Sequence, residues 1–419
     1  MEHIEEKSII TQRFCQPPLQ RITVEEAVEL MTGLAARVQD QESVLLTQSL
    51  GRILSRDITA EFDNPPFPRS AIDGYACRWE DTRGALEGAP VYLKVKGEID
   101  AGHSARIQVK SGEAVRIMTG APVPQGCDCC IRQEDTDYGE TTVEIRRAAK
   151  CWENYCFQGE DFKKGSLMLP AGRKLGYVEI GILASLGRRN VPVVRRPSVA
   201  IVTTGDEVVL PGEPLGEGKI YNSNLFLLNA RMMEFGITPF RTKVVADDPV
   251  KLAKTLTELT GRADLIITTG GVSVGKKDIV HEALGIAGAD QIFWRVQLKP
   301  GTPTIFSMLD QAPVVSLSGN PFGALANFEL LIRPVLAKMS GDPSLLPKRR
   351  EAVMADPFPK ASPGRRFIRG IYEDGYVHMP RGLHSSGVLA SMEGCNCMVD
   401  IEAGTMELKA GDRVNVVVL

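Results

Sequence analysis

The sequence contains no uninterrupted apolar run near the roughly 20 residues that a membrane-spanning helix requires. Its opening, MEHIEEKSII, lacks the basic segment followed by an apolar one that marks a secretory signal. The charges nearly balance, with 49 Lys and Arg against 52 Asp and Glu, so no sequence-wide attraction for nucleic acid or anionic lipid is expected. These absences argue against a membrane segment and against general nucleic-acid binding, and they favour a cytoplasmic protein.

Histidine is scarce, with five residues, and the nine cysteines show no repeated spacing. An odd number without a pattern favours free thiols over a disulfide framework. Cys127, Cys129 and Cys130, with Cys151 and Cys156 downstream, offer a metal cluster as an alternative. We do not favour it, because C-x-C-C is not a usual zinc spacing and no histidine lies nearby in the sequence.

The 419 residues suggest about three domains, and 40 Gly and 26 Pro indicate many turns. Strand and helix signals alternate in one long segment, which is typical of an α/β domain with a mostly parallel sheet, whereas other segments carry short strands only. We expect a multidomain fold of the α/β plus β class. Its parts are a leader (1–21), a discontinuous helical domain (22–50 and 157–190), a β-rich domain (51–156), an α/β domain (191–342) and a C-terminal β-barrel or sandwich (343–419).

Several element ends are marked by residues with a clear capping role. Thr23 with Glu26 predicts a capped helix, and the apolar stretch YVEIGILASLG predicts a second helix ended by Gly187. A long helix is expected from Pro321 to about Met339. The stretch PSLLPKRR after it is interpreted as a linker.

Every unusual loop of the α/β segment follows an expected strand, and such loops converge at one edge of a parallel sheet. The loops are TTGDE, ADDP, TTGGVSVGKKD, KPGTP and SGNP. Glu207, Asp247 and Asp278 offer oxygen ligands suited to Mg²⁺, while Arg295, Lys299 and the glycine-rich backbone amides suit oxyanions. This combination indicates phosphate chemistry with a metal.

Each of these residues also has a simpler interpretation. Asp248 before Pro249 is best explained as a helix N-cap, which leaves Asp247 as the freer carboxylate, and Asp278 could equally be a cap. The TTG repeats at 203–205 and 268–270 could be plain turns. GGVSVGKK matches a P-loop through its lysine, but Lys277 stands where Ser or Thr should hold Mg²⁺, so a P-loop nucleotide hydrolase is not favoured.

The β-rich segment contains two further notable strings, RSAIDGYA with Asp73 and RIMTGAPVPQGCD with Thr119. On physical grounds alone both are interpreted as turns, and spacing does not decide whether they are functional.

Taken in order, RSAIDGYA, MTGAPVP, GEDFKKG, TTGDE, GGVSVGKKD, KPG and SGNP resemble the molybdopterin molybdenumtransferase family, the MoeA type shared with the E domain of gephyrin. The resemblance covers roughly residues 20 to 419. It implies a homodimer of four-domain subunits in which the α/β domain binds molybdopterin. It also implies the reaction, in which adenylylated molybdopterin and molybdate, with Mg²⁺, give molybdenum cofactor and AMP. Possible partners are a molybdopterin adenylyltransferase upstream and apo-molybdoenzymes or their chaperones downstream.

The resemblance also assigns roles to single residues. Asp73 and Thr119 would complete the site, Glu207 would contact the pterin nucleotide, and Asp247 and Asp278 would hold Mg²⁺ or orient the reacting groups. Arg295, Lys299, Arg369 and Ser386 would surround the molybdate. Further substrate contacts are expected from the turn and helix-start residues Gly205, Gly270, Gly271, Ser273, Gly275, Asn320 and Pro321.

The chain departs from the family pattern at five of the motif positions. Arg295 replaces a lysine, Thr302 a lysine, Ser318 a proline, Gly387 a histidine and Cys156 an arginine. An Arg in place of Lys exchanges a point donor for a planar fork. These departures keep two alternatives open: a molybdopterin-binding or scaffold paralogue without turnover, and an insertase that prefers tungstate.

Overall fold

The computed structural model describes residues 19–104, 106–272 and 279–419. Two compact units divide the chain. The first contains residues 1–43, 51–53 and 192–419, and the second contains residues 44–50 and 54–191. Each unit is described by itself below.

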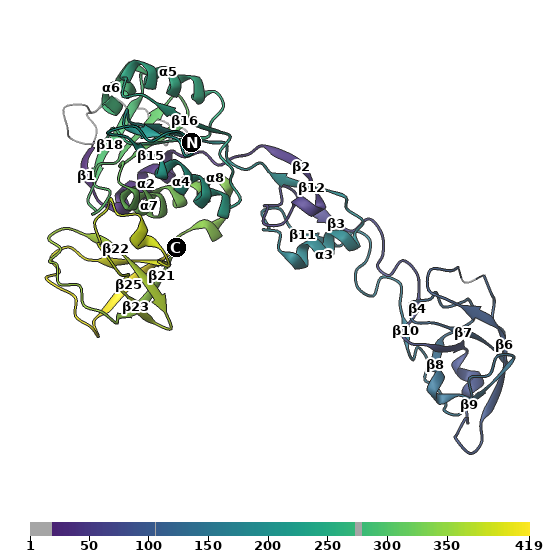
Figure 1. The fold of residues 1–419 in the computed structure, drawn as a ribbon. Coiled ribbons are helices and arrows are strands. Elements are labelled where there is room, and N and C mark those ends of the chain that lie inside the picture. The colour runs from purple at the N-terminus through teal and green to yellow at the C-terminus, as the bar shows by residue number, and fades with distance from the viewer. Residues whose placement is uncertain (1–18, 105, 273–278) are drawn as a thin grey trace, which may run out of the picture. The chain divides into compact units, whose positions relative to one another are not determined.

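A seven-stranded mixed sheet forms the centre of the first unit (Figure 1). Its strand order is β1-β18-β19-β20-β17-β13-β16, and all neighbours are parallel except β19, which runs antiparallel to both β18 and β20. Residues 19–21, assigned to a leader from the sequence, lie in β1 at the edge of this sheet. The strands are β1 (Leu19–Ile22), β13 (Val199–Thr204), β16 (Arg241–Val245), β17 (Leu265–Thr269), β18 (Asp290–Val296), β19 (Ile305–Leu309) and β20 (Ala312–Leu317).

Helices cover both faces of this sheet, as expected for strands that are mostly apolar and buried along their whole length (Figure 1). On one face, α5 (Pro249–Thr260) and α6 (Ile279–Ile286) pack on the sheet in one apolar core. On the other face, a larger core contains α2 (Val24–Leu34), α4 (Ser223–Glu234), α7 (Pro321–Asn327) and α8 (Arg333–Ser340).

The helix ends follow the expected chemistry. The Thr23 hydroxyl accepts from the Glu26 N–H at 3.2 Å while the Glu26 carboxylate accepts from the Thr23 N–H at 2.8 Å, so the predicted capping box of α2 is confirmed. Asp248 caps α5 and accepts from the Val250 N–H at 3.0 Å, which confirms its structural role. The long helix from Pro321 also forms, but a π-helical turn at Phe328–Ile332 joins α7 to α8.

A closed five-stranded barrel follows in the same unit. The linker interpretation of PSLLPKRR is wrong, because Pro343–Leu345 forms a 3-10 turn and Lys348 already begins a strand that pairs with β25. The barrel strands are β21 (Lys348–Met354), β22 (Arg366–Glu373), β23 (Tyr376–His378), β24 (Cys397–Ile401) and β25 (Arg413–Val418).

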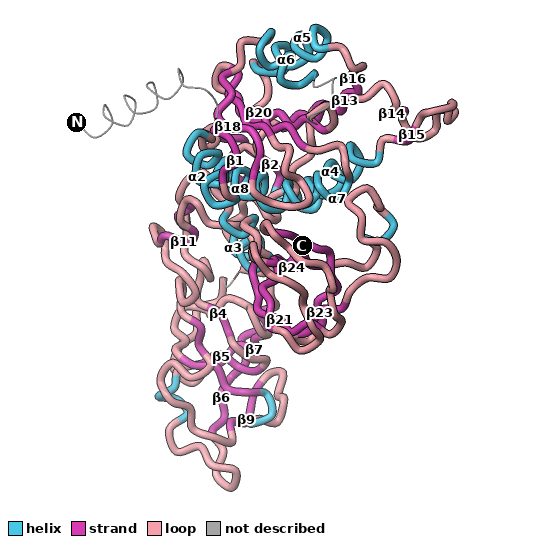
Figure 2. Tube along the Cα trace, turned by 90° about the vertical axis from the view of Figure 1, so that its left-hand side faces the viewer, coloured by secondary structure: helices cyan, strands magenta, loops and turns pink. Residues whose placement is uncertain are grey.

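The second unit is rich in short strands connected by long loops (Figure 2). Its main sheet has the order β8-β5-β7-β6-β9, and α3 (Tyr177–Ser185) is the predicted helix that ends before Gly187, whose φ is +69°. The main strands are β5 (Gly74–Cys77), β6 (Val91–Ile99), β7 (Glu113–Ile117), β8 (Cys129–Arg132) and β9 (Thr142–Ile145). The shorter strands of the unit are β3 (Ile58–Thr59), β4 (Arg69–Ser70), β10 (Tyr155–Cys156) and β11 (Leu167–Leu169).

Three smaller features complete the description. Strands β2 (Gln41–Leu45) and β12 (Asn190–Val194) pair with each other, as do β14 (Val208–Val209) and β15 (Ile220–Tyr221). Among the described residues, no helix combines the length and apolarity needed to cross a bilayer.

Candidate functional site

A cavity of about 330 Å³ opens where three parallel strands end. We call it the strand-end cavity. The ends of β13 and β17 line it, and so do the segment after β20 and the first residues of α4 and α7. Among its lining residues are Glu207, Gly270, Asn320 and Pro321. The partial positive charge of a helix N-terminus favours an anionic ligand such as a phosphate here, although the Leu225 and Phe322 N–H groups already donate to Asn222 and Ser386.

Polar atoms buried around this cavity lack partners among the described residues. They are Thr203 Oγ1, Thr204 Oγ1, Asn222 Nδ2 and Asn224 Oδ1. Buried polar groups are almost always hydrogen-bonded in folded proteins, so a cluster of unpaired ones in a cavity wall indicates a ligand that supplies the missing partners.

Glycine is required at the turn after β17. Gly270 has φ +97°, and a Cβ there would stand 2.4 Å from the carbonyl oxygen of Thr204. The next residue, Gly271, has φ +65° and is nearly as crowded. Only residues without a side chain let the ends of β13 and β17 approach this closely at the cavity wall.

A second cavity, of about 460 Å³, lies between the Lys299 loop and the barrel. We call it the cationic cavity, because Lys299, Lys360, Arg366 and Arg369 line it and no carboxylate of the described residues does. The two cavities adjoin each other. Pro321 lines the strand-end cavity and Phe322 the cationic one, and the Phe322 N–H donates to the Ser386 carbonyl at 3.1 Å.

Arg369 is the central feature of the cationic cavity. It is 1% exposed, and its guanidinium donates to the carbonyls of Val388 and Ser385, each at 2.6 Å, and to Ser391 Oγ at 2.7 Å. Burial lowers the pKa of Arg369. In the described part of the chain no carboxylate forms an ion pair with this cation, although buried charges are normally paired. Arg369 therefore keeps a positive charge at the cavity wall, where its guanidinium lies over the Phe322 ring at 4.4 Å and two of its five N–H donors bond to no described residue.

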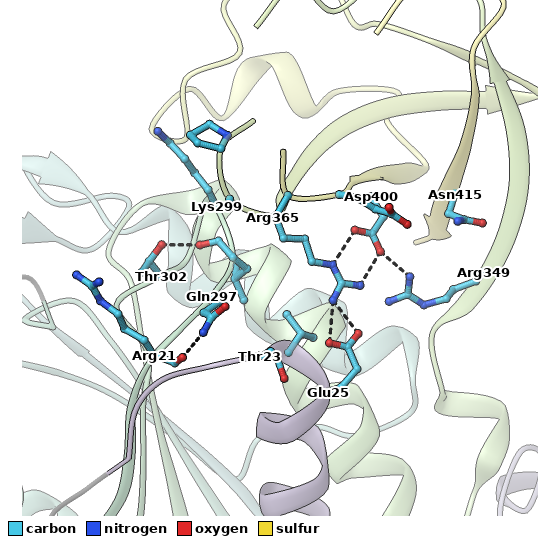
Figure 3. Close-up of a pocket in the computed structure, with 16 residues that line it drawn as sticks. Arg21, Thr23, Glu25, Gln297, Lys299, Thr302, Arg349, Arg365, Asp400 and Asn415 are labelled. Carbon is cyan, nitrogen blue, oxygen red and sulfur yellow. Dashed lines mark hydrogen bonds and ion pairs between the residues drawn. The ribbon is translucent and has the colours of Figure 1, made fainter. Parts of the chain in front are cut away.

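The largest of these three cavities, about 940 Å³, shares Lys299 with the cationic cavity, and Figure 3 shows the residues that line it. We call it the ion-pair cavity, because Arg365 crosses it to reach Glu25 and Asp400. Burial alone would raise the pKa of the Asp400 carboxyl. The hydrogen bonds from Arg365 and Arg349 together lower this pKa by more than burial raises it, so the net shift is downward. These charges neutralise one another and hold strand β22 in place, which is a structural role.

Two acidic residues at adjacent strand ends bind each other's backbone. The Asp247 N–H donates to Asp206 Oδ1 at 3.0 Å, and the Asp206 N–H donates to Asp247 Oδ2 at 3.4 Å. Asp206 precedes Glu207, which lines the strand-end cavity, whereas neither Asp206 nor Asp247 lines it. Among the described residues no three acidic, cysteine or histidine side chains are arranged to hold a metal ion. Mg²⁺ usually binds through one or two carboxylates together with substrate phosphates, so this donor set fits it.

In the second unit, Asp73 and Thr119 are in direct contact. Asp73 Oδ1 accepts from the Thr119 hydroxyl and from the Thr119 N–H, each at 2.7 Å. These two bonds lower the pKa of the Asp73 carboxyl, the hydroxyl having the larger effect. Gly74 is required beside them, since a Cβ there would stand 1.8 Å from the Ile131 carbonyl oxygen. The arrangement holds an exposed, ionised carboxylate in a fixed position.

Seven of the fourteen residues that the sequence singled out in the α/β segment and barrel line the strand-end cavity or the cationic cavity. Glu207, Gly270, Asn320 and Pro321 share the strand-end cavity, and Lys299, Arg369 and Ser386 share the cationic one. Gly205 and Gly271 lie at the ends of β13 and β17 beside the strand-end cavity without lining it. Ser273, Gly275 and Asp278 lie outside the described residues, as does Lys277 of the P-loop-like string.

Arg295 lines neither cavity. Its guanidinium lies over the Trp294 ring at 4.1 Å, and its φ is +68°. Its predicted role in oxyanion binding therefore stays a prediction.

Sequence reasoning missed three residues of the cationic cavity, namely Lys360, Arg366 and His384. Alternation does not indicate Arg366, because residues 366 and 369 are three apart in one strand and side chains alternate every second residue. Nothing in the spacing points to Lys360 or His384, which reach the cavity from separate loops.

Comparison with known proteins identifies the family. Residues 22–187 match the MoeA N-terminal region (domains I and II), residues 200–338 a "probable molybdopterin binding domain", and residues 351–419 the MoeA C-terminal region (domain IV). The molybdopterin molybdenumtransferase of Staphylococcus epidermidis is 35% identical over 399 residues, covering 94% of this chain and 95% of the relative. The chain belongs to the molybdopterin molybdenumtransferase family.

Other members of this enzyme family agree. The molybdopterin molybdenumtransferase of Staphylococcus aureus strain COL is 34% identical over 405 residues, covering 94% of this chain and 95% of its own. The molybdopterin biosynthesis MoeA protein of Pyrococcus horikoshii matches with a TM-score of 0.81 at 29% identity, covering 95% of this chain and 99% of that one. The expected fold class, an α/β domain with a C-terminal β-barrel and a separate β-rich segment, is confirmed.

Proposed function

We propose that this molybdopterin molybdenumtransferase family member inserts molybdate into adenylylated molybdopterin, with Mg²⁺, and releases AMP. The observation that carries the proposal is the buried guanidinium of Arg369, which has no carboxylate partner among the described residues and lines a cavity without acids. A small dianion such as molybdate would neutralise this charge. Lys299 and Ser386, at the wall of the same cavity, add a cation and a hydroxyl.

The adjoining strand-end cavity suits the other substrate. The threonine and asparagine side chains at its wall suit the polar edges of a pterin, and the positive end of the α4 dipole favours the phosphates. Because Pro321 and Phe322 are consecutive and face different cavities, the two substrates would be held next to each other. Proximity of this kind is itself a large part of catalysis.

The chemistry requires no nucleophile from the protein. A molybdate oxygen attacks the adenylate phosphorus, the phosphoanhydride bond breaks, and that oxygen leaves in AMP. A second molybdate oxygen takes the two dithiol protons and leaves as water, while the two sulfurs bind the metal, and no electrons are transferred. The protein holds both reactants and stabilises the charge on the oxygens through Lys299 and Arg369.

Asp247, with Asp206 beside it, would hold the Mg²⁺. The ion supplies charge neutralisation at the pyrophosphate. Asp73 is a further acidic group for the reaction, and the Thr119 hydroxyl and N–H lower the pKa of its carboxyl. The role of Asp278 in holding Mg²⁺ or orienting the reacting groups stays a prediction. So do the choice between molybdate and tungstate, the homodimer, and the upstream and downstream partners.

Direct binding of the oxyanion tests the proposal. Equilibrium binding of molybdate and of tungstate to the full chain should be detectable, and Arg369→Gln should weaken it by about tenfold to a hundredfold, as expected for a lost charge-assisted hydrogen bond. Arg350→Gln on the exposed part of β21 is the matched control, and it should bind as the wild type does. Equal affinity in the Arg369 and Arg350 variants would refute the assignment of the cationic cavity.

A further inference from the structure

Lys299 stands in a loop that the barrel holds from one side. Its N–H donates to the Arg365 carbonyl at 3.0 Å, and its own carbonyl accepts from the Phe367 N–H at 2.8 Å. These bonds fix the backbone of Lys299 against the start of β22. The lysine side chain, by contrast, is exposed and lies at the wall of both the cationic and the ion-pair cavity (Figure 3).

Asn327 holds the same loop from the other side. Its Nδ2 donates to the Gly301 carbonyl at 3.0 Å and to Thr304 Oγ1 at 2.6 Å, and that hydroxyl donates to the Gly301 carbonyl at 2.8 Å. Asn327 and Thr304 are both 0% exposed. The three groups form a closed, buried triangle two residues from Lys299.

The contact requires glycine at position 301. Gly301 has φ +101°, and a Cβ there would stand 2.5 Å from Asn327 Oδ1. The asparagine side chain is thus packed directly on the backbone of the loop. A displacement of Asn327 would move Gly301 and, through one intervening residue, Lys299.

The buried amide of Asn327 also lowers the stability of the fold. Asn327 Oδ1 is buried and has no hydrogen-bond partner among the described residues. An unpaired buried acceptor destabilises a fold, and an apolar side chain of the same size would avoid that cost. What the amide adds is its pair of directed N–H donors, and both point to the Lys299 loop.

We propose that Asn327 is a positioning residue, which sets the place of the Lys299 ammonium in the cationic cavity by fixing the Gly301 carbonyl. The inference rests on the proposed function, since Lys299 is taken to contact the oxyanion. Asn327 itself lines no cavity, and it acts through the loop alone. Helix α7 thereby contacts the site at two places. Phe322 near its start lines the cationic cavity, and Asn327 at its end binds the Lys299 loop.

The test uses the full chain and variants of similar shape. Asn327→Leu removes the two donors, Thr304→Val removes the hydroxyl between them, and Thr304→Ser restores it. We expect the molybdate KM and the molybdate Kd to rise about tenfold in Asn327→Leu and Thr304→Val, the size of one hydrogen bond. The turnover number should change much less, and Thr304→Ser should resemble the wild type.

A double-mutant cycle with Lys299→Ala shows whether Asn327 acts on molybdate binding by positioning Lys299 or by a general loosening of the fold. If Asn327 acts through Lys299, then Asn327→Leu should weaken molybdate binding no further once Lys299 is gone. Leu336→Ala is the control, because Leu336 is buried in the same core but lines no cavity. It should lower the melting temperature and leave the molybdate KM unchanged.

The outcomes are distinct. An unchanged molybdate KM in folded Asn327→Leu would overturn the positioning role alone. So would a double variant whose loss of molybdate affinity is the full product of the losses in Asn327→Leu and Lys299→Ala. A wild-type protein that does not bind molybdate would overturn the proposed function, and the positioning role with it. Should Asn327→Leu fail to fold, the comparison of Thr304→Val with Thr304→Ser decides the question.

Discussion

Glu25 and Arg365 stand 340 residues apart in the chain and form a two-pronged ion pair. Arg365 Nη1 donates to Glu25 Oε1 at 2.7 Å and to Oε2 at 2.9 Å, while Nε and Nη2 donate to Asp400 at 2.9 and 2.8 Å (Figure 3). One guanidinium therefore ties helix α2 to two barrel segments. The residues that follow Arg365 include Phe367, whose N–H binds the Lys299 carbonyl, and Arg369, which lines the cationic cavity. The ion pair between Glu25 and Arg365 therefore helps to fix the backbone on which the proposed site is built.

Removing Arg365 should destabilise the protein far more than removing Glu25. The Asp400 side chain is 6% exposed and would lose both bonds from Arg365 while keeping the one from Arg349 at 2.6 Å, so we expect a cost of about 2 kcal/mol, below that of a buried charge without any partner. The Glu25 side chain is 64% exposed, so Glu25→Gln should cost less than about 1 kcal/mol. Denaturant unfolding of Arg365→Ala, Glu25→Gln and the control Arg350→Ala measures the difference. Equal costs for the first two would contradict this account.

The same cluster predicts a loss of stability in acid. The folded-state pKa of Asp400 lies below its usual value despite burial, because Arg365 and Arg349 bind the ionised form, and the pKa of Glu25 is lowered by Arg365 in the same way. Carboxyls with lowered pKa values stabilise the fold above their unfolded pKa near about 4, and that contribution disappears as the pH falls through the folded value. Stability measured between about pH 5 and pH 2 should fall less steeply in Arg365→Ala than in the wild type.

The sequence was sufficient for the parts of the fold that depend on local chemistry. Thr23 and Glu26 predict their capping box, and Asp248 with Pro249 predicts the start of α5, because each signal lies within a few residues. The strand at 19–22 was missed since its pairing with β18 depends on residues some 270 positions away, and four residues carry no periodicity of their own. The linker interpretation failed for the same reason, since Lys348 belongs to a strand only through β25.

In the candidate site, too, the sequence identified the residues with a local signal and missed those that reach the site only through the tertiary structure. Loops after strands can be assigned to one edge of the sheet from the sequence alone, which is why Glu207, Gly270 and Asn320 were found. Lys360 and His384 reach the cationic cavity from barrel loops, and Asn327 acts from inside a helix. No spacing rule connects such residues to Lys299, so only the tertiary structure shows them.

Thr119 should set the acid limit of activity if Asp73 acts as an ionised group. The Thr119 hydroxyl lowers the pKa of Asp73, so ionised Asp73 persists to lower pH in the wild type. Thr119→Val should move the acid limb of the kcat/KM profile to higher pH, and Thr119→Ser should restore it. Asp73→Asn removes the charge and should lower kcat by about tenfold or more, the range for a lost electrostatic contact. A profile that does not move in Thr119→Val would separate Asp73 from the reaction.

Gly270 should tolerate no side chain. Its φ of +97° and the 2.4 Å approach to the Thr204 carbonyl predict that Gly270→Ala costs about 3 kcal/mol or more and weakens binding of the pterin substrate. Gly261→Ala is the matched control, because a Cβ there meets nothing within 4 Å and its φ is −73°. Thermal unfolding and substrate titration of both variants check the prediction, and a Gly270→Ala protein as stable as Gly261→Ala would contradict it.

Asp247 should determine the response to magnesium. Replacing it with asparagine removes a hard, charged oxygen ligand, so the Mg²⁺ concentration for half-maximal activity should rise about tenfold or more. Asp248→Asn keeps the helix cap and serves as the control with an unchanged requirement. If both variants need the same Mg²⁺ concentration as the wild type, Asp247 does not hold the ion.

AMP release from adenylylated molybdopterin, with Mg²⁺ and with molybdate, tungstate or neither, tests the central claim most directly. We predict release that depends on the oxyanion and falls sharply in Arg369→Gln, with an oxygen of labelled molybdate recovered in the AMP. Tight binding of the pterin substrate without release, or release at the same rate in the absence of any oxyanion, would contradict the account.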